Sequence, residues 1–272
     1  MKKKILITLL VVAIISVSVM AFAGCNGGGV KVGFQTGTTG QSYTEEYINL
    51  KPVNYQNVTN AVQDMITGRI DYVITDIAPA KAIAGHANFN GKVKVIDIPL
   101  TDEIYCFAVN KENDTLKAQI NEFLTNKSEE LKSLQEAYIA GTNDVKKISS
   151  GNKNAENALI VATNAEFPPF EYTIGEFYAG YDMEVMQMFC VEYGYELVIE
   201  HMEFKAVVQS VNTKKADVGA AALTFNEDRA KQVNFTDKYY ESTQVIICMA
   251  DDTTFDNCKT REDVEKILNS LA

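Results

Sequence analysis

Two oppositely charged side chains stand beside predicted strands, where they could hold the charged groups of a small ligand. Asp76 follows the apolar segment 70–75, and Arg229 lies in a short polar segment at 226–229. A guanidinium can hold a carboxylate through two parallel charge-assisted hydrogen bonds, and an aspartate can pair with an ammonium group. Each residue also has an ordinary alternative role, which is a helix cap for Asp76 and a surface ion pair for Arg229.

An aromatic side chain is expected at the end of another strand. The β-branched run 159–163 predicts this strand, and Pro168 and Pro169 must end it in a rigid loop because proline has no backbone N–H. Phe167 is thereby held near a strand's carboxyl end, which is where ligands bind in open α/β sheets. A core aromatic at a turn is an equally good interpretation of this stretch alone.

A loop rich in glycine and threonine, residues 35–41, follows the predicted strand 30–34 and is expected to open a helix. Its backbone amides would suit an anion. The loop lacks the Lys-Ser/Thr ending of a phosphate-binding loop and the glycine spacing of a dinucleotide site, so a carboxylate fits it better than a nucleotide. A plain strand-to-helix turn is the competing interpretation.

These candidate residues are distributed over strand and helix patterns that predict an α/β fold. Further extended segments are expected at 92–98, 103–109, 195–201, 217–223 and 239–249, of which 103–109 and 239–249 would cross between two lobes. Helical periodicity is found at 58–66, 112–138, 204–211 and 260–271. Thr260 to Asp263 resemble a capping box, and Asp182 is expected to cap another helix. Residues 141–155 have almost no apolar content and are interpreted as a linker.

The composition restricts the class of protein. A chain of 272 residues, 46% of them hydrophobic, can bury the cores of two modest lobes. Its net charge of −11 argues against a nucleic-acid partner. Beyond Cys25 the sequence has four cysteines, no CxxC motif and only two histidines, so neither a metal site nor a cofactor is expected. The four cysteines are Cys106, Cys190, Cys248 and Cys258.

The amino-terminal residues have the pattern of an export signal. Three lysines at 2–4 precede an apolar run at 5–23, and the sequence Phe22-Ala23-Gly24-Cys25 resembles a bacterial lipobox. We therefore expect residues 1–24 to be removed and Cys25 to be lipidated, with 25–29 as a tether that holds the protein outside the cell membrane. Loss of the three lysines would change the net charge from −11 to −14. An uncleaved membrane anchor is the alternative.

Four segments together resemble the extracytoplasmic solute-binding proteins of family 3, the amino-acid-binding proteins of ABC importers. They are 164–172 with Phe-Pro-Pro-Phe, 221–240 with Leu-Thr-Phe-Asn-Glu-Asp-Arg and Phe-Thr-Asp-Lys-Tyr-Tyr, the Gln-Thr-Gly-Thr-Thr-Gly loop, and 68–80. The resemblance covers nearly all of 30–140 and 155–272. It implies a type II periplasmic-binding-protein-like fold of two lobes joined by a two-strand hinge, and a monomeric binding protein whose partner is an ABC transporter permease.

The family's usual order is rotated in this sequence, which indicates a circular permutation. Members normally begin with the Phe-Pro-Pro-Phe segment, whereas the Gly-Thr-Thr-Gly strand comes first here. Lobe 2 is therefore expected to comprise 30–102 and 243–272, lobe 1 to comprise 158–242 and 103–140, and 141–157 to join the family's usual termini. The two ends of the chain should then be neighbours in space. The rival account is a pair of truncated halves from a tandem receptor, each needing a partner chain.

The resemblance also implies how the charged ends of a free amino acid would be bound. Arg229 would take the α-carboxylate, helped by Thr224 and by the amides of Thr38 and Thr39. Asp76 would take the α-ammonium group.

The remaining predicted contacts concern the second acceptor and the ligand's side chain. The carbonyl of Ala222 would accept from the ammonium group, and Phe167 and Phe204 would cover the aliphatic part. The amides of Asn164 and Gln35, where several relatives carry an acid and a lysine, make a neutral polar ligand such as glutamine the first expectation.

Three alternatives stay open at this stage. Glu166 could favour a basic ligand. The chain could be a ligand-sensing lipoprotein without a transporter. It could also be a cyclohexadienyl-dehydratase-like enzyme on the same fold, for which Glu166 is the one candidate acid or base.

Overall fold

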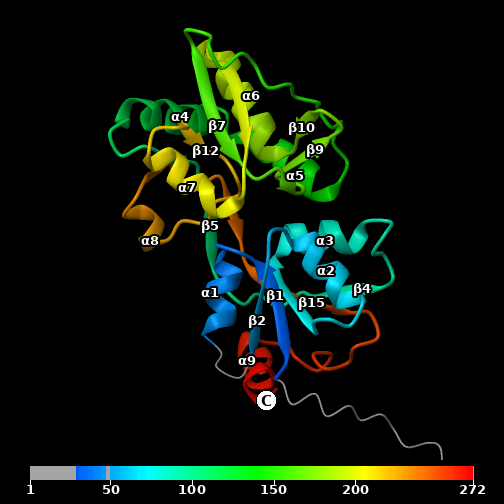
Figure 1. The fold of residues 1–272 in the computed structure, drawn as a ribbon. Helices are drawn as coiled ribbons and strands as arrows, with labels where there is room; N and C mark the ends of the chain where they lie inside the picture. Colours follow the sequence, from blue (N-terminus) through cyan, green and yellow to red (C-terminus); the bar gives the residue numbers. More distant parts are fainter. Residues whose placement is uncertain (1–28, 47–49, 272) are drawn as a thin grey trace, which may run out of the picture.

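Two five-stranded sheets form the centres of two lobes, one above the other in Figure 1. The computed structural model describes residues 29–46 and 50–271, so the predicted signal peptide and Cys25 lie outside the described residues. The sheet of lobe 2 has the order β2 (Lys51–Tyr55), β1 (Lys31–Gln35), β3 (Tyr72–Asp76), β15 (Gln244–Met249) and β4 (Val93–Ile96).

The sheet of lobe 1 repeats this pattern. Its order is β11 (Glu196–His201), β7 (Ala158–Thr163), β12 (Val218–Gly219), β6 (Ala108–Val109) and β13 (Asn234–Phe235). In both sheets the second strand has a parallel neighbour on each side, and the fourth strand runs antiparallel to the third. This arrangement confirms the predicted α/β fold of type II.

A two-stranded ribbon joins the lobes. Strand β5 (Glu103–Tyr105) pairs antiparallel with β14 (Tyr240–Ser242). Strand β5 leads into β6 of lobe 1, and β14 leads into β15 of lobe 2, so the fourth strand of each sheet arrives from the other lobe. Figure 1 shows β5 in the narrow region between the lobes. We call β5 and β14 the hinge ribbon.

Lobe 2 is completed by helices whose apolar faces cover its sheet. They are α1 (Thr39–Glu45), α2 (Val58–Ile66), α3 (Ile77–Gly85) and α9 (Arg261–Ser270). Helix α2 begins where the Asn57 side chain accepts from the Asn60 N–H, and it buries Val58, Ala61, Val62 and Met65 at helical spacing. The capping box predicted for α9 is confirmed, since Thr260 and Asp263 exchange both bonds.

Lobe 1 carries five helices in the described part of the chain and a small antiparallel sheet. The helices are α4 (Asp114–Asn126), α5 (Ser128–Ala140), α6 (Tyr181–Tyr193), α7 (Phe204–Asn212) and α8 (Glu227–Ala230). The small sheet consists of β8 (Glu166–Phe167), β9 (Glu171–Ile174) and β10 (Phe177–Ala179). Among the residues described, no helix has the length and apolar character needed to cross a bilayer.

Two local predictions were wrong. The expected strand 217–223 is only β12, because Ala222 has φ +47 and the chain leaves the sheet toward the hinge ribbon. Asp182 does not cap α6, whose N-cap is Gly180. The Asp182 carboxylate points inward instead and accepts from the Ala222 N–H at 2.9 Å and the Tyr239 hydroxyl at 2.7 Å.

The polar segment 141–155 is less free than a linker pattern predicts. Ile148 is buried and forms a bridge with Tyr178. The Gly151 N–H donates to the Leu197 carbonyl at 2.8 Å, and the Ile199 N–H donates to the Ser150 hydroxyl at 2.8 Å. The segment therefore runs along β11 and covers that edge of the sheet.

The two ends of the described chain meet in lobe 2. Val30 before β1 and Leu271 after α9 pack against the same apolar cluster, which includes Val32, Val264 and Leu268. Figure 1 shows the carboxyl end of the chain beside the start of β1. The predicted circular permutation would require the two ends to be close, and it stays a prediction.

We predict that Gly180→Ala is far more destabilising than Gly175→Ala. Both glycines have positive φ, but a Cβ on Gly180 would lie 2.2 Å from the Phe170 carbonyl oxygen, whereas a Cβ on Gly175 meets nothing within 4 Å. Gly175→Ala should cost about 1 kcal/mol of unfolding free energy from backbone strain alone. Gly180→Ala should cost more than roughly 3 kcal/mol in urea denaturation. Equal losses would contradict the close approach.

Candidate functional site

The cleft between the lobes is lined by residues that were predicted from the sequence. They come from both lobes and are Gln35, Thr38, Thr39, Asp76, Phe167, Phe204, Ala222, Thr224 and Arg229. The remaining predicted residue, Asn164, is hydrogen-bonded to Gln35. The structure thus brings the whole predicted set together. Its members lie at or just after the ends of β1, β3 and β7, in β8 and the start of α7, in the segment that follows β12, and in α8.

The cleft is closed in this conformation. The space left between its lining residues has a volume of about 10 Å³, which is room for about one water molecule. An amino acid could therefore enter only after the lobes separate.

Arg229 bridges the two lobes. Its helix α8 begins at Asn226, whose side chain accepts from the Arg229 N–H. The guanidinium donates to the Thr224 carbonyl at 2.6 Å and, across the cleft, to the Gly37 carbonyl at 2.9 Å. It also lies 5.2 Å from the centre of the Phe204 ring. Burial lowers its pKa from the ordinary value of arginine, and the negative charge of nearby acids opposes that shift.

Asp76 is the last residue of β3 and is held by the hinge ribbon. Its side chain makes no cap bond to α3, so the helix-cap alternative is wrong. It accepts from the Tyr105 hydroxyl at 2.6 Å and the Ser242 hydroxyl at 3.2 Å. Burial first, and then the charge of Glu103, raise the pKa of Asp76 to about 7. Its carboxyl group therefore changes protonation near neutral pH.

The threonines of the cleft already have hydrogen-bond partners. The Thr38 hydroxyl caps α1 by accepting from the Gln41 N–H, and the Thr38 N–H donates to the Gln35 carbonyl at 3.4 Å. The Thr39 hydroxyl donates to Glu103 at 3.0 Å. Of the two predicted amides, that of Thr39, in the first turn of α1, is the better placed to donate to an anion.

The cleft has aromatic walls on the lobe 1 side. Phe167 of β8 is buried and lies 6.5 Å from Phe170, ring centre to ring centre. Phe204 opens α7 beneath the Arg229 guanidinium. Ala222 keeps its left-handed backbone because its N–H donates to the buried Asp182 carboxylate. The phenyl rings of Phe167 and Phe204 and the left-handed turn of the backbone at Ala222 therefore border the charged groups.

Neutral amides close the mouth of the cleft. The Gln35 amide donates to the Asn164 side-chain oxygen at 2.7 Å and to the Gln56 carbonyl at 2.9 Å. Asn57 of lobe 2 donates to Glu166 of lobe 1 at 3.2 Å. The Gln56 amide also donates to Glu203 at 3.2 Å. Glu203 also forms an ion pair with Lys205 of the same lobe at 3.0 Å, so the negative charge on the lobe 1 side of this mouth comes chiefly from Glu166.

Glu103 is a site residue that the sequence reasoning missed. It begins β5, is 7% exposed and accepts from three threonine hydroxyls. They belong to Thr39, Thr101 and Thr224. A carboxylate inside the predicted extended crossing 103–109 was the available signal, because a charged residue in such a run needs buried partners.

Two further acids lie buried behind the cleft. Glu171 has no exposed surface, and neither of its carboxyl oxygens has a hydrogen-bond partner among the described residues. Burial raises the pKa of Glu171 well above its ordinary value and that of Asp182 to about 7. Both positions therefore favour the neutral acid, which avoids an unpaired buried charge.

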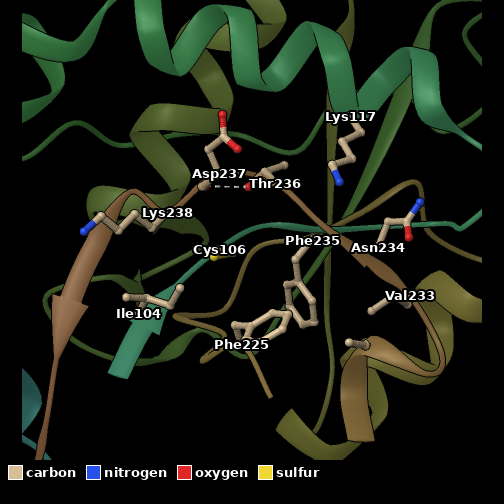
Figure 2. A pocket seen from close by; sticks show the side chains of 11 residues that line it. Ile104, Cys106, Lys117, Phe225, Val233, Asn234, Phe235, Thr236, Asp237 and Lys238 are labelled. Atoms are coloured by element: carbon tan, nitrogen blue, oxygen red, sulfur yellow. Dashed lines mark hydrogen bonds between the residues drawn. The ribbon is translucent and has the colours of Figure 1, made fainter. Parts of the chain in front are cut away.

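A larger hollow lies outside the cleft, on lobe 1. It has a volume of about 530 Å³ and is lined by residues of α4, β5, α8 and β13 and by the segment 236–238, with Phe225 and Phe235 in edge contact at 5.5 Å. Figure 2 shows Lys117 pointing from α4 toward these residues and Asp237 pointing away from the rings. The smaller cleft is the stronger candidate, because buried groups of opposite charge converge only there within the described structure.

Neither a metal site nor a disulfide is present in the described part of the chain. No group of three or more His, Cys, Asp or Glu side chains is arranged there to hold a metal ion. Cys106, Cys190, Cys248 and Cys258 are all free thiols.

Comparison with known proteins relates the second half of the chain to a transport family. Residues 159–272 match "Bacterial extracellular solute-binding proteins, family 3". The chain is 31% identical over 103 residues to the arginine-binding extracellular protein ArtP of Bacillus subtilis, covering 38% of this chain and 40% of ArtP. It is 30% identical over 88 residues to a probable histidine-binding protein of Neisseria gonorrhoeae, covering 32% and 33% of the two chains.

The matches span about two fifths or less of these curated relatives. Among solved structures, the Gly52Ala mutant of arginine-bound ArgBP from T. maritima is similar with a TM-score of 0.45 and 14% identity. That match covers 90% of this chain and 94% of the other.

We predict that Asp182→Asn flattens the dependence of stability on pH. The folded-state pKa of Asp182, about 7, lies above the ordinary value of 3.8, so the folded protein holds this proton more tightly than the unfolded chain. Stability should therefore fall as pH rises from about 4 to about 7, and the asparagine variant should lose that part of the slope. Urea denaturation at pH 5 and pH 8 measures it. An unchanged difference would mean that Asp182 is ionised in the folded protein.

Proposed function

We propose that the whole chain binds a free polar L-amino acid between its lobes, as a member of the bacterial extracellular solute-binding proteins, family 3, whose model residues 159–272 match. One observation carries this proposal. Arg229 of lobe 1 and Asp76 of lobe 2 are buried in the same cleft and have opposite charges when Asp76 is ionised. A free amino acid carries the complementary charges on two groups attached to one carbon atom, the α-carboxylate and the α-ammonium group.

The proposed binding mode follows from these groups. The ligand's α-carboxylate replaces the Gly37 carbonyl as a partner of Arg229 and accepts from the Thr39 N–H. Its α-ammonium group donates to Asp76 and to the Ala222 carbonyl. Since Arg229 and Asp76 belong to different lobes, the ligand stabilises the closed arrangement by contacting both.

The ligand's side chain is proposed to be basic, with arginine ahead of glutamine. Glu166 supplies negative charge at the mouth of the cleft, whereas the charge of Glu203 is offset by Lys205. The relatives reported above are named for arginine and histidine. Phe167 and Phe204 would cover the aliphatic stem, and Gln35 and Asn164 would accept from its terminal nitrogens. The expectation of glutamine rests on these two amides alone.

We further propose that the chain delivers its ligand to an ABC importer permease, as a monomer anchored outside the membrane by a lipid on Cys25. The family consists of binding proteins rather than enzymes. The structure does not favour the dehydratase alternative, because Glu166 lies exposed at the mouth and its carboxylate accepts one hydrogen bond in the described structure, from the Asn57 amide. A sensor without a transporter would use the same cleft.

The circular permutation is proposed as the origin of the rotated order. Support comes from the proximity of Val30 and Leu271, and from the order of the lobes along the chain. Lobe 2 would comprise 30–102 and 243–272, and lobe 1 would comprise 103–140 and 158–242. The segment 141–157 would connect the two parts of lobe 1, at the place where the family's usual ends would meet.

Arg229→Ala and Asp76→Ala should each weaken binding at least about 100-fold without unfolding the protein, because each leaves one ligand charge buried without a partner. Isothermal titration with arginine and then glutamine measures the loss. Lys231→Ala, an exposed residue of the same turn as Arg229, is the matched control. Unaltered affinity in either site variant would refute the binding mode.

Binding should also release a proton near neutral pH. The ligand's ammonium group favours ionised Asp76, so the pKa of about 7 in the free protein falls in the complex. Affinity should therefore decrease as pH falls below about 7. At pH 6.5 the calorimetric enthalpy should differ between phosphate and Tris buffers by an amount that reflects proton release. Identical enthalpies would exclude Asp76 as the ammonium partner.

A further inference from the structure

Glu103 occupies an unusual position between the lobes. It begins the hinge strand β5 and is almost fully buried. Its Oε2 atom accepts from Thr224 of lobe 1 at 2.6 Å and from Thr39 of lobe 2 at 3.0 Å, and its Oε1 atom accepts from Thr101 at 2.7 Å. One oxygen atom of the hinge thus joins the two lobes directly.

The hydrogen bonds from Thr224 and Thr39 to Glu103 prevent these two hydroxyls from donating to a ligand at the same time. A hydroxyl group has a single proton to donate. The Thr224 and Thr39 protons both point to Glu103 in the closed cleft, so neither is free to donate to a ligand. The Thr39 oxygen is further engaged as an acceptor from the Gln244 side chain at 3.0 Å.

The charge of Glu103 acts on both groups that would hold a ligand. It raises the pKa of Arg229, which keeps the guanidinium charged, and it raises the pKa of Asp76, which favours the protonated carboxyl group. The groups that contact Asp76 directly are neutral, namely the hydroxyls of Tyr105 and Ser242 and the Gln244 side chain, while the Arg229 guanidinium interacts with Asp76 through its charge. A carboxylate at this point resembles the α-carboxylate of a ligand in charge and in its threonine partners.

We propose that Glu103 is a latch: it holds Thr39 and Thr224 together when the cleft is closed, and a ligand's α-carboxylate must compete with it for the hydrogen bond from the Thr224 hydroxyl. This inference rests on the proposed function. The exchange involves only hydrogen bonds, with one acceptor oxygen replacing another. Glu103 is a positioning residue: it competes with the ligand for the Thr224 hydroxyl and thereby lowers the affinity for the ligand.

The test compares Glu103→Gln with Glu241→Gln in the full chain. Glu241 lies on the other strand of the hinge ribbon, is exposed and pairs with Lys238, so its variant makes the same change of charge without touching the latch. Glu103→Gln should give the ligand-free protein a larger radius of gyration in small-angle X-ray scattering. It should also bind arginine about tenfold more tightly, the value of one hydrogen bond to a charged group.

The outcomes separate the latch from the proposed function. If the unaltered chain binds none of the twenty amino acids, the proposed function fails, and scattering of the ligand-free variant still decides the latch. An unchanged scattering profile, or weaker binding by Glu103→Gln, overturns it. If Glu103→Gln does not fold, Thr39→Val serves in its place, because it removes one bond to Glu103 and keeps the Thr39 backbone N–H; it should open the ligand-free protein, and a compact profile would overturn the latch.

Discussion

The structure depends on one constraint: each charged group of the cleft is buried and must be satisfied by a partner from the opposite lobe or from the hinge ribbon. Burying an unpaired charge is costly enough to change protonation states or to unfold a protein. Arg229 meets this requirement through a carbonyl of the other lobe, and Asp76 meets it through hydroxyls of the hinge ribbon. Closure of the cleft and the ionisation of its residues are therefore linked.

This constraint explains why the hinge ribbon contributes chemistry as well as connection. Tyr105 donates to Asp76, meets the Phe170 ring edge-on and lies tilted against the Tyr240 ring, so the ribbon holds the acid beside several aromatic rings. Because the ribbon continues directly into one strand of each lobe's sheet, β6 in lobe 1 and β15 in lobe 2, separation of the lobes moves whole sheets and leaves their cores intact. A change of contacts at a few polar groups is then sufficient to open or close the cleft.

The sequence predicts much of the fold and nearly the whole lining of the cleft, because strand ends, helix periodicity and turn residues follow local rules. It does not predict the hydrogen bonds of the buried polar side chains in and behind the hinge ribbon. Glu103, Tyr105 and Asp182 acquire their roles from partners more than 25 residues away, and no local pattern encodes those contacts. Asp182 shows this clearly: its position at the start of a helix suggests a cap, but burial against Tyr239 decides its orientation.

The central claim is that one chain forms one complete amino-acid site from two lobes in rotated order. The most direct measurement is calorimetric titration with arginine combined with light scattering of the same sample. The account predicts one ligand bound per monomeric chain of 30.1 kDa, or slightly less after removal of residues 1–24. Binding that occurs only in a dimer, or no binding to any amino acid by the folded monomer, would contradict it.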